Sequence, residues 1–130
     1  MPFASEKLDA YRTSVGLAAD VCLATRGFPR GYYFLANQLN RAALSIAANI
    51  AEGNGRFTAA DRGNFLAIAR GSVQECVALL EIAARRRVLT PETHARLRDQ
   101  LIAIGHMVAG LIKSVDKRRA PGTLPRAQRD

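Results

Sequence analysis

Residues 97–115 carry apolar side chains at steps of four, three, four, three and four residues, which is the spacing of a coiled-coil heptad. The six positions are Leu97, Leu101, Ile104, Val108, Leu111 and Val115. A helix with such a stripe must bury it against other helices. Thr90 and Pro91, just before it, suit the N-cap and first helical positions. The stretch therefore predicts one long helix that requires helical partners.

Three earlier segments also have helical periodicity, and prolines and glycines separate them. The predicted core positions are Leu8, Tyr11, Val15, Ala18 and Cys22 over about residues 5–26; Leu35, Leu39, Ile46 and Ile50 over about residues 32–52; and Phe65, Ile68, Ser72, Cys76, Leu79 and Ala83 over about residues 59–87, after Thr58 as N-cap. No run of period two indicates a strand. We therefore expect an all-α fold, an antiparallel up-down-up-down four-helix bundle over residues 1–116.

Residues 117–130 lose this periodicity and gain proline, glycine and charge, so they are predicted to form a basic flexible C-terminal tail. The chain of 130 residues is 48% hydrophobic and 23% charged, as globular proteins are. No signal pattern or apolar run of about 20 residues is present, so a cytoplasmic protein without a membrane partner is expected. Cys22 and Cys76 lie in apolar runs, and we predict that both are small buried hydrophobes.

The predicted helices carry more packable surface than one bundle needs. Each glycine inside a helix lowers helix stability by about 1 kcal/mol relative to alanine, so close packing of another backbone is a reasonable explanation for these glycines. These are Gly16, Gly63, Gly71, Gly105 and Gly110, and a further small-residue stripe is Ala43, Ala47 and Ala51. This surplus of packable helix surface favours a homo-oligomer. The alternative is a monomer in which small residues merely tolerate solvent.

Two stretches carry a family resemblance, QLNRAALSIAANIAEGNGR at residues 38–56 and FLAIARGSVQECVALLEIA at residues 65–83. Together they resemble the family of proteins encoded by intervening sequences in bacterial large-subunit ribosomal RNA genes. The resemblance implies a four-helix bundle and a ring-shaped homopentamer. A related branch comprises accessory proteins of diversity-generating retroelements, which are basic pentamers that bind a reverse transcriptase and nucleic acid.

Polar residues inside these stretches recur one helical turn apart. We predict a structural polar network that fixes helix register or a subunit interface, formed by Arg41, Ser45, Asn49 and Glu52 with Arg62, Arg70, Ser72 and Glu75. Antiparallel packing would bring Glu52 towards Arg62, and Arg41 towards Glu75. The alternative is a solvated face.

We expect no enzyme, no metal site and no cofactor. His94 and His106 have no Cys, Asp or Glu at metal-ligand spacing, and no phosphate-binding loop or paired carboxylate motif occurs.

The net charge of +8 leaves two functions open. In the first, the oligomer binds RNA or DNA through phosphate contacts. The predicted contact residues are Arg85, Arg86, Arg87, Lys113, Lys117, Arg118 and Arg119. In the second, the protein is a scaffold that docks an acidic protein partner, and the basic groups only aid steering. The bundle should place the two basic groups at opposite ends.

Overall fold

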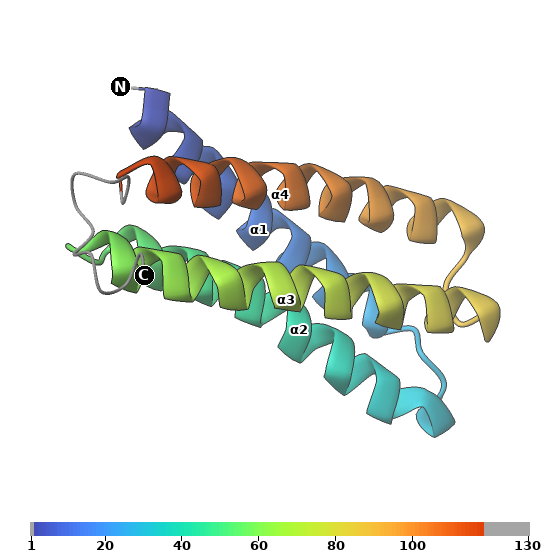
Figure 1. Ribbon diagram of the computed structural model, residues 1–130. Coiled ribbons are helices and arrows are strands. Elements are labelled where there is room, and N and C mark those ends of the chain that lie inside the picture. Colours follow the sequence, from blue (N-terminus) through green and yellow to red (C-terminus); the bar gives the residue numbers. More distant parts are fainter. Residues whose placement is uncertain (1, 119–130) are drawn as a thin grey trace.

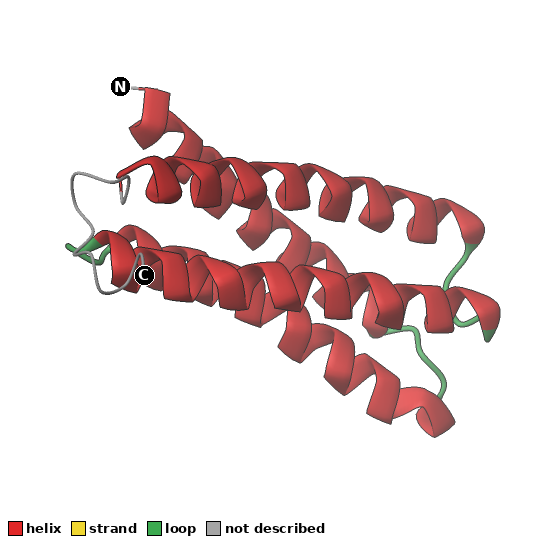
Figure 2. Ribbon diagram, in the orientation of Figure 1, coloured by secondary structure: helices red, strands yellow, loops and turns green. Residues whose placement is uncertain are grey.

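The computed structural model describes residues 2–118, which form four α-helices and one short 3-10 helix without a β-strand (Figures 1 and 2). The elements are α1 (Pro2–Thr25), η1 (Arg30–Tyr32), α2 (Tyr33–Asn54), α3 (Ala59–Arg85) and α4 (Pro91–Arg118). The predicted tail begins within α4, which continues through Lys117 and Arg118. The remainder of that tail, Arg119 included, lies outside the described residues.

The helices run up and down in sequence order, so the predicted bundle is confirmed. α1 packs against α2 and α4, and α3 packs against the same two helices. The connections from α1 to α2 and from α3 to α4 lie at one end, which we call the Arg86 end (Figure 1). The start of α1, the connection from α2 to α3 and the end of α4 lie at the other, which we call the Lys7 end. No described helix contains an apolar stretch long enough to cross a membrane.

Local sequence explains where α3 and α4 begin. The Thr58 hydroxyl accepts a hydrogen bond from the backbone N–H of Asp61 at 3.1 Å. The Thr90 hydroxyl accepts one from the backbone N–H of Thr93, also at 3.1 Å. Each bond satisfies a backbone donor that the first helical turn leaves without a partner. Both predicted N-caps are therefore confirmed.

Gly53 lies inside α2 and is buried against α3, whereas the sequence predicted that α2 would end at about residue 52. A Cβ atom at Gly53 would lie 3.3 Å from Cβ of Phe65 and 3.5 Å from the carbonyl oxygen of Arg62. These distances show that glycine lets the backbones of α2 and α3 approach closely here. Gly53 thus serves helix packing, and α2 ends at Asn54, with Gly55 as its C-cap.

The core lies between the four helices and consists of aliphatic side chains. All six predicted positions of α4 and all four of α2 are buried, as expected. The α3 core combines predicted and unpredicted positions. Ser72, Cys76 and Ala83 are buried as predicted, while Ile68 is half exposed. The remaining buried α3 residues are Leu66, Ala69, Val73 and Leu80.

The predicted core stripe of α1 is wrong at four of its five positions, and only Ala18 packs against the core. Leu8, Tyr11 and Val15 are 40–46% exposed, and Cys22 is exposed as well. The core-facing residues are instead Ala10, Ser14, Leu17 and Val21. Because α1 has two apolar faces and the face with Ala10, Ser14, Leu17 and Val21 packs inward, periodicity predicted the wrong face.

The displaced apolar residues of α1 lie on its flank towards α2. Asn54 Nδ2 donates to the carbonyl oxygen of Lys7 at 3.3 Å, and Asn40 Nδ2 donates to Thr25 Oγ1 at 2.9 Å. These two bonds fix which sides of the helices meet. From the helical repeat, the same flank of α2 carries exposed or half-buried apolar residues. We call this surface the α1–α2 face, and it comprises Leu8, Tyr11, Val15, Cys22, Leu44, Ala47 and Ala51.

The two cysteines have different environments. Cys76 is buried in the core, as predicted, and burial together with the nearby Glu75 raises the pKa of its thiol to about 12. Cys22 was predicted to be buried, but it lies exposed on the α1–α2 face. The thiol of Cys76 is therefore shielded and protonated at neutral pH, whereas that of Cys22 meets solvent.

Candidate functional site

A hydrogen-bonded group of three polar side chains links α2 to α3. The hydroxyls of Ser45 and Ser72 lie 2.8 Å apart, close enough for a hydrogen bond. Asn49 Nδ2 donates to Ser45 Oγ at 3.1 Å and to the carbonyl oxygen of Ser45 at 2.8 Å. Ser72 is buried, and the other two are half-buried. The centre of the predicted polar network is thus a serine pair that fixes the register of the two helices.

Next to this group, α2 and α3 border an open depression of about 250 Å³. Its lining residues are Gln38, Arg41, Ala42, Ser45 and Glu75. Arg41 and Glu75 thus face a common space, as the antiparallel packing predicted. No ion pair joins them in the described chain, so the depression is polar and open rather than closed by a salt bridge.

The remaining members of the predicted network are arranged differently. Glu52 pairs with Arg56, one turn further along the chain, at 2.8 Å, rather than with Arg62. Arg62 Nη1 donates instead to the carbonyl oxygen of Arg56 at 2.6 Å. Arg70 is exposed, and its side chain has no hydrogen bond or ion pair within residues 2–118. The expected pairing of Glu52 with Arg62 is wrong, because the short connection places the nearer Arg56 in reach.

Cationic groups from three helices meet at the Lys7 end. Burial lowers the pKa of Lys7, and the positive charges of Arg62 and Arg118 lower it further. The effect of one charge on the pKa of another falls off with distance, so these two arginines lie near Lys7. Lys113 and Lys117 are exposed near the end of the same helix as Arg118. The predicted basic residues at the end of α4 are therefore joined by Lys7 and Arg62, which sequence spacing could not place there.

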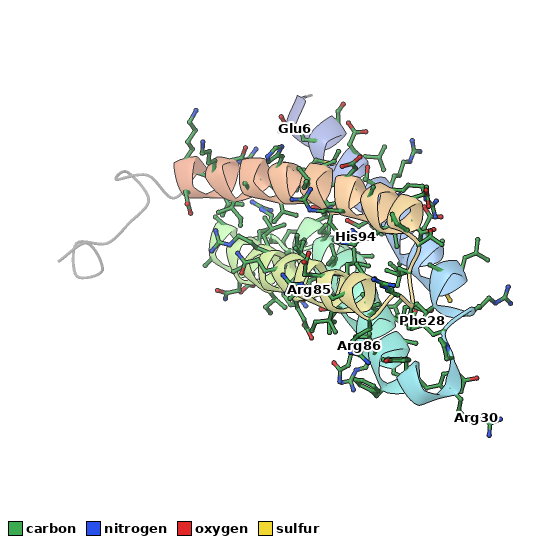
Figure 3. The ribbon with its side chains drawn as sticks, turned by 90° about the vertical axis from the view of Figure 1, so that its right-hand side faces the viewer. Glu6, Phe28, Arg30, Arg85, Arg86 and His94 are labelled. Atoms are coloured by element: carbon green, nitrogen blue, oxygen red, sulfur yellow. The ribbon has the colours of Figure 1, made fainter. Side chains whose placement is uncertain are left out.

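The arginine run that ends α3 lies at the Arg86 end, opposite the end of α4 (Figure 3). Arg85 Nε donates to a carboxylate oxygen of Glu81 at 3.1 Å, and both side chains are mostly exposed. Arg86 Nε donates to Tyr32 Oη at 3.0 Å. Arg87 is exposed and has a backbone φ of 60°. The guanidinium of Arg85 is thus paired with a carboxylate, that of Arg86 contacts a tyrosine, and Arg87 has a left-handed backbone conformation.

The left-handed conformation of Arg87 belongs to a two-bond helix cap. The backbone N–H of Val88 donates to the carbonyl oxygen of Ala83, and that of Arg87 donates to the carbonyl oxygen of Ala84, both at 3.0 Å. This is the Schellman pattern, in which the position of Arg87 is usually glycine. An arginine there costs about 1–2 kcal/mol in backbone strain.

Aromatic residues, which the spacing of charges does not identify, gather beside these arginines. The Arg86 guanidinium carbon lies 5.9 Å from the centre of the Tyr32 ring. The Tyr32 and Phe34 rings are stacked, with centroids 6.3 Å apart and planes 30° apart. The signal was present as the run GYYF at residues 31–34, but only the fold brings it to Arg86, 54 residues away.

The histidines take no part in either basic end group. His106 borders a depression of about 250 Å³ with Glu6, Asp9, Met107 and Gly110. His94 is half-buried in the first turn of α4. Within residues 2–118, no three His, Cys, Asp or Glu side chains are grouped as a metal site requires.

Comparisons with known proteins place the chain in a family. A crystal structure of a protein of unknown function from the S23 ribosomal protein family of Bacteroides thetaiotaomicron has the same fold, with a TM-score of 0.78. The two are 23% identical over 83% of this chain and 98% of the other. A comparison with curated proteins finds no match. The family model of the 23S rRNA-intervening sequence proteins matches residues 6–110, and the chain therefore belongs to this family.

Proposed function

We propose that this protein is a non-enzymatic, basic homo-oligomer that binds nucleic acid through phosphate contacts at the two ends of its bundle. The observation that carries the proposal is the convergence of cationic groups from separate helices at both ends. At the Lys7 end, basic side chains from three helices gather, and the positive charges of Arg62 and Arg118 contribute to the lowered pKa of Lys7. A concentration of positive charge of this kind attracts polyanionic phosphate.

The Arg86 end supports the same proposal. No ion pair within the described residues involves Arg26, Arg30, Arg86 or Arg87, although all four lie at this end. Arg87 also keeps a strained backbone where glycine would fit without strain. Strain retained at one position is consistent with a function for that side chain. A phosphate-binding role would account for both features.

The homo-oligomer rests on the α1–α2 face. Leu8, Tyr11 and Val15 are large and partly exposed on α1, and Leu44 is 61% exposed on α2. A second copy of the chain would remove this contiguous apolar surface from water. The family resemblance implies five subunits.

Nucleic-acid binding is tested by filter binding of an unstructured RNA and a duplex DNA across a salt series. Affinity should fall steeply with salt, because each phosphate contact contributes about 0.7–0.9 to the slope of log K against log salt. Replacing Arg86 and Arg87 together by glutamine should lower both affinity and slope. A matched control replaces Arg12 and Arg70 by glutamine, and these are two exposed arginines away from the bundle ends. This control should change the affinity and the salt slope little.

Deletion of residues 117–130 tests the predicted tail in the same assay, and it should weaken RNA binding and flatten the salt slope. Absence of binding by the wild-type protein even at low salt would contradict the proposal and favour the scaffold that docks an acidic partner.

The assembly is tested by light scattering coupled to size exclusion at micromolar concentration. We expect a mass that is a multiple of 14.1 kDa, with five subunits as the state that the family resemblance implies. Val15→Glu should break the assembly, because it places a charge in the α1–α2 face. Ile102→Glu is the matched control, since Ile102 is equally exposed on α4, and it should leave the mass unchanged. A wild-type mass near 14.1 kDa would contradict the oligomer.

A further inference from the structure

The Arg86 end holds an ordered stack of three side chains from two helices and a connection. Arg86 covers one part of the Tyr32 ring, and the Phe34 ring stacks on Tyr32. The hydrogen bond from Arg86 Nε to Tyr32 Oη ties the stack to the end of α3. Phe34 is 65% exposed, so its ring meets solvent on one side while Tyr32 lies beside it on the other. An exposed aromatic ring is a surface on which another flat ring can stack.

Three further arginines lie at the same end of the bundle as this stack. Arg26 and Arg30 lie in the connection that leads into α2, and Arg87 follows Arg86 at the end of α3. Figure 3, which looks onto this end, shows Arg86 beside the start of α2 and Arg30 extending from the chain. Arg86 uses its Nε–H on Tyr32, which leaves four Nη–H donors. Exposed aromatic surface and guanidinium donors thus share one end of the bundle.

We propose that the Arg86 end is a site for single-stranded nucleic acid, in which an unpaired base stacks on Phe34 and the flanking phosphates contact Arg30, Arg86 and Arg87. The inference rests on the proposed function and adds a preference to it. Phosphate contacts alone do not distinguish single strands from duplexes, but stacking requires a base whose face is free. Every base has such a face, so the site prefers single strands with little sequence selectivity.

The Lys7 end provides the comparison. Phe57 is 97% exposed in the connection between α2 and α3, and it follows Arg56 at the end of the bundle that also holds Lys7 and Arg62. No aromatic ring stacks on Phe57 within the described residues, whereas Phe34 rests on Tyr32. The two phenylalanines therefore share exposure and charge, and they differ in whether the ring is held. Phe57 is the matched control for Phe34.

The test measures binding of a fluorescein-labelled ten-nucleotide oligouridylate and a ten-base-pair RNA duplex by fluorescence anisotropy at constant salt. Phe34→Ala should weaken binding of the single strand about five-fold or more, which is the effect of losing one stacked base, and should leave binding of the duplex unchanged. Phe57→Ala should change neither. Phe34→Leu keeps an apolar side chain of similar size without a flat ring, so it should weaken binding of the single strand as Phe34→Ala does. This second variant shows whether the effect of Phe34→Ala comes from the lost ring rather than from misfolding.

A second measurement reports stacking directly. The chain has no tryptophan, so Phe34→Trp introduces a single tryptophan at the site. The single strand should quench its emission and the duplex should not, while the tryptophan of Phe57→Trp should respond little to either.

The two hypotheses fail in different ways. If wild-type protein binds neither probe at low salt, the proposed function itself fails. If it binds both, but Phe34→Ala and Phe57→Ala bind the single strand alike and Phe34→Trp is not quenched, the stacking site is overturned while phosphate binding stands.

Discussion

Replacing Arg87 by glycine should stabilise the fold and weaken nucleic-acid binding at the same time. The left-handed conformation costs a residue with a side chain about 1–2 kcal/mol. Glycine removes this strain, but it loses about 0.5–1 kcal/mol more backbone entropy on folding. The free energy of unfolding should therefore rise by roughly 0.5–1 kcal/mol. For a chain of this length, that corresponds to an increase in Tm of about 2–4 °C.

Thermal denaturation followed by circular dichroism measures the first effect, at one protein concentration because assembly would shift the Tm. Arg87→Gln is the control, since it loses the charge and keeps the strained backbone. Both variants should bind RNA more weakly than the wild type and with similar affinities, but only Arg87→Gly should melt at a higher temperature. Equal Tm values for the two variants would refute the assignment of strain to residue 87.

Four further predictions concern the core, the polar residues and the cysteines. Ser45→Ala should lower stability by about 1–3 kcal/mol in urea unfolding, because the hydroxyls of Ser72 and Ser45 share a bond in a partly buried site. Ser14→Ala is the opposite case, because the Ser14 hydroxyl is buried without a hydrogen-bond partner among the described residues. This change should leave the free energy of unfolding the same or raise it. A decrease of more than about 1 kcal/mol would contradict the prediction. Glu52→Ala should cost at most about 1 kcal/mol in the same assay, because its pair with Arg56 is exposed, and a larger loss would indicate that Glu52 has another partner in the assembly. Cys76 should react with a thiol reagent only after unfolding, since its thiol is buried with a pKa of about 12. Cys22 is exposed and should react in the folded chain. Its reaction should be slower at protein concentrations at which assembly covers the α1–α2 face.

Periodicity predicted the helices well where only one face is apolar. In α4 the heptad positions are the core positions, because the rest of the helix surface is mostly polar. In α1, Leu8, Tyr11 and Val15 outweigh Ala10 and Ser14 in hydrophobicity, yet the smaller residues face inward. Sequence periodicity measures how apolar a face is, and it does not reveal how closely the neighbouring helices approach. The face of α1 with the larger side chains is the surface on which the proposed assembly rests.

The candidate site was predictable only where it is local in sequence. The run Arg85 to Arg87 and the basic end of α4 were found because their charges are consecutive or nearly so. Tyr32 and Arg86 are 54 residues apart, and only the antiparallel topology brings them together. The same holds for Lys7, Arg62 and Arg118, which come from three helices. Ser45 and Ser72 were predicted to lie in one network because the connection between their helices is short.

The length of the bundle sets a size scale for any ligand that engages both ends. α3 has 27 residues and, at about 1.5 Å per residue, separates the Arg86 end from the Lys7 end by roughly 40 Å. Phosphates along one strand of a duplex follow one another at 3.4 Å, so roughly 12 base pairs are needed to cover this distance. A shorter duplex reaches one end of a subunit, and a longer one lying along the bundle reaches both. The helix lengths thus set a minimum duplex length for contact with both ends of one subunit, and the affinity for duplexes should rise in a step once they exceed that length.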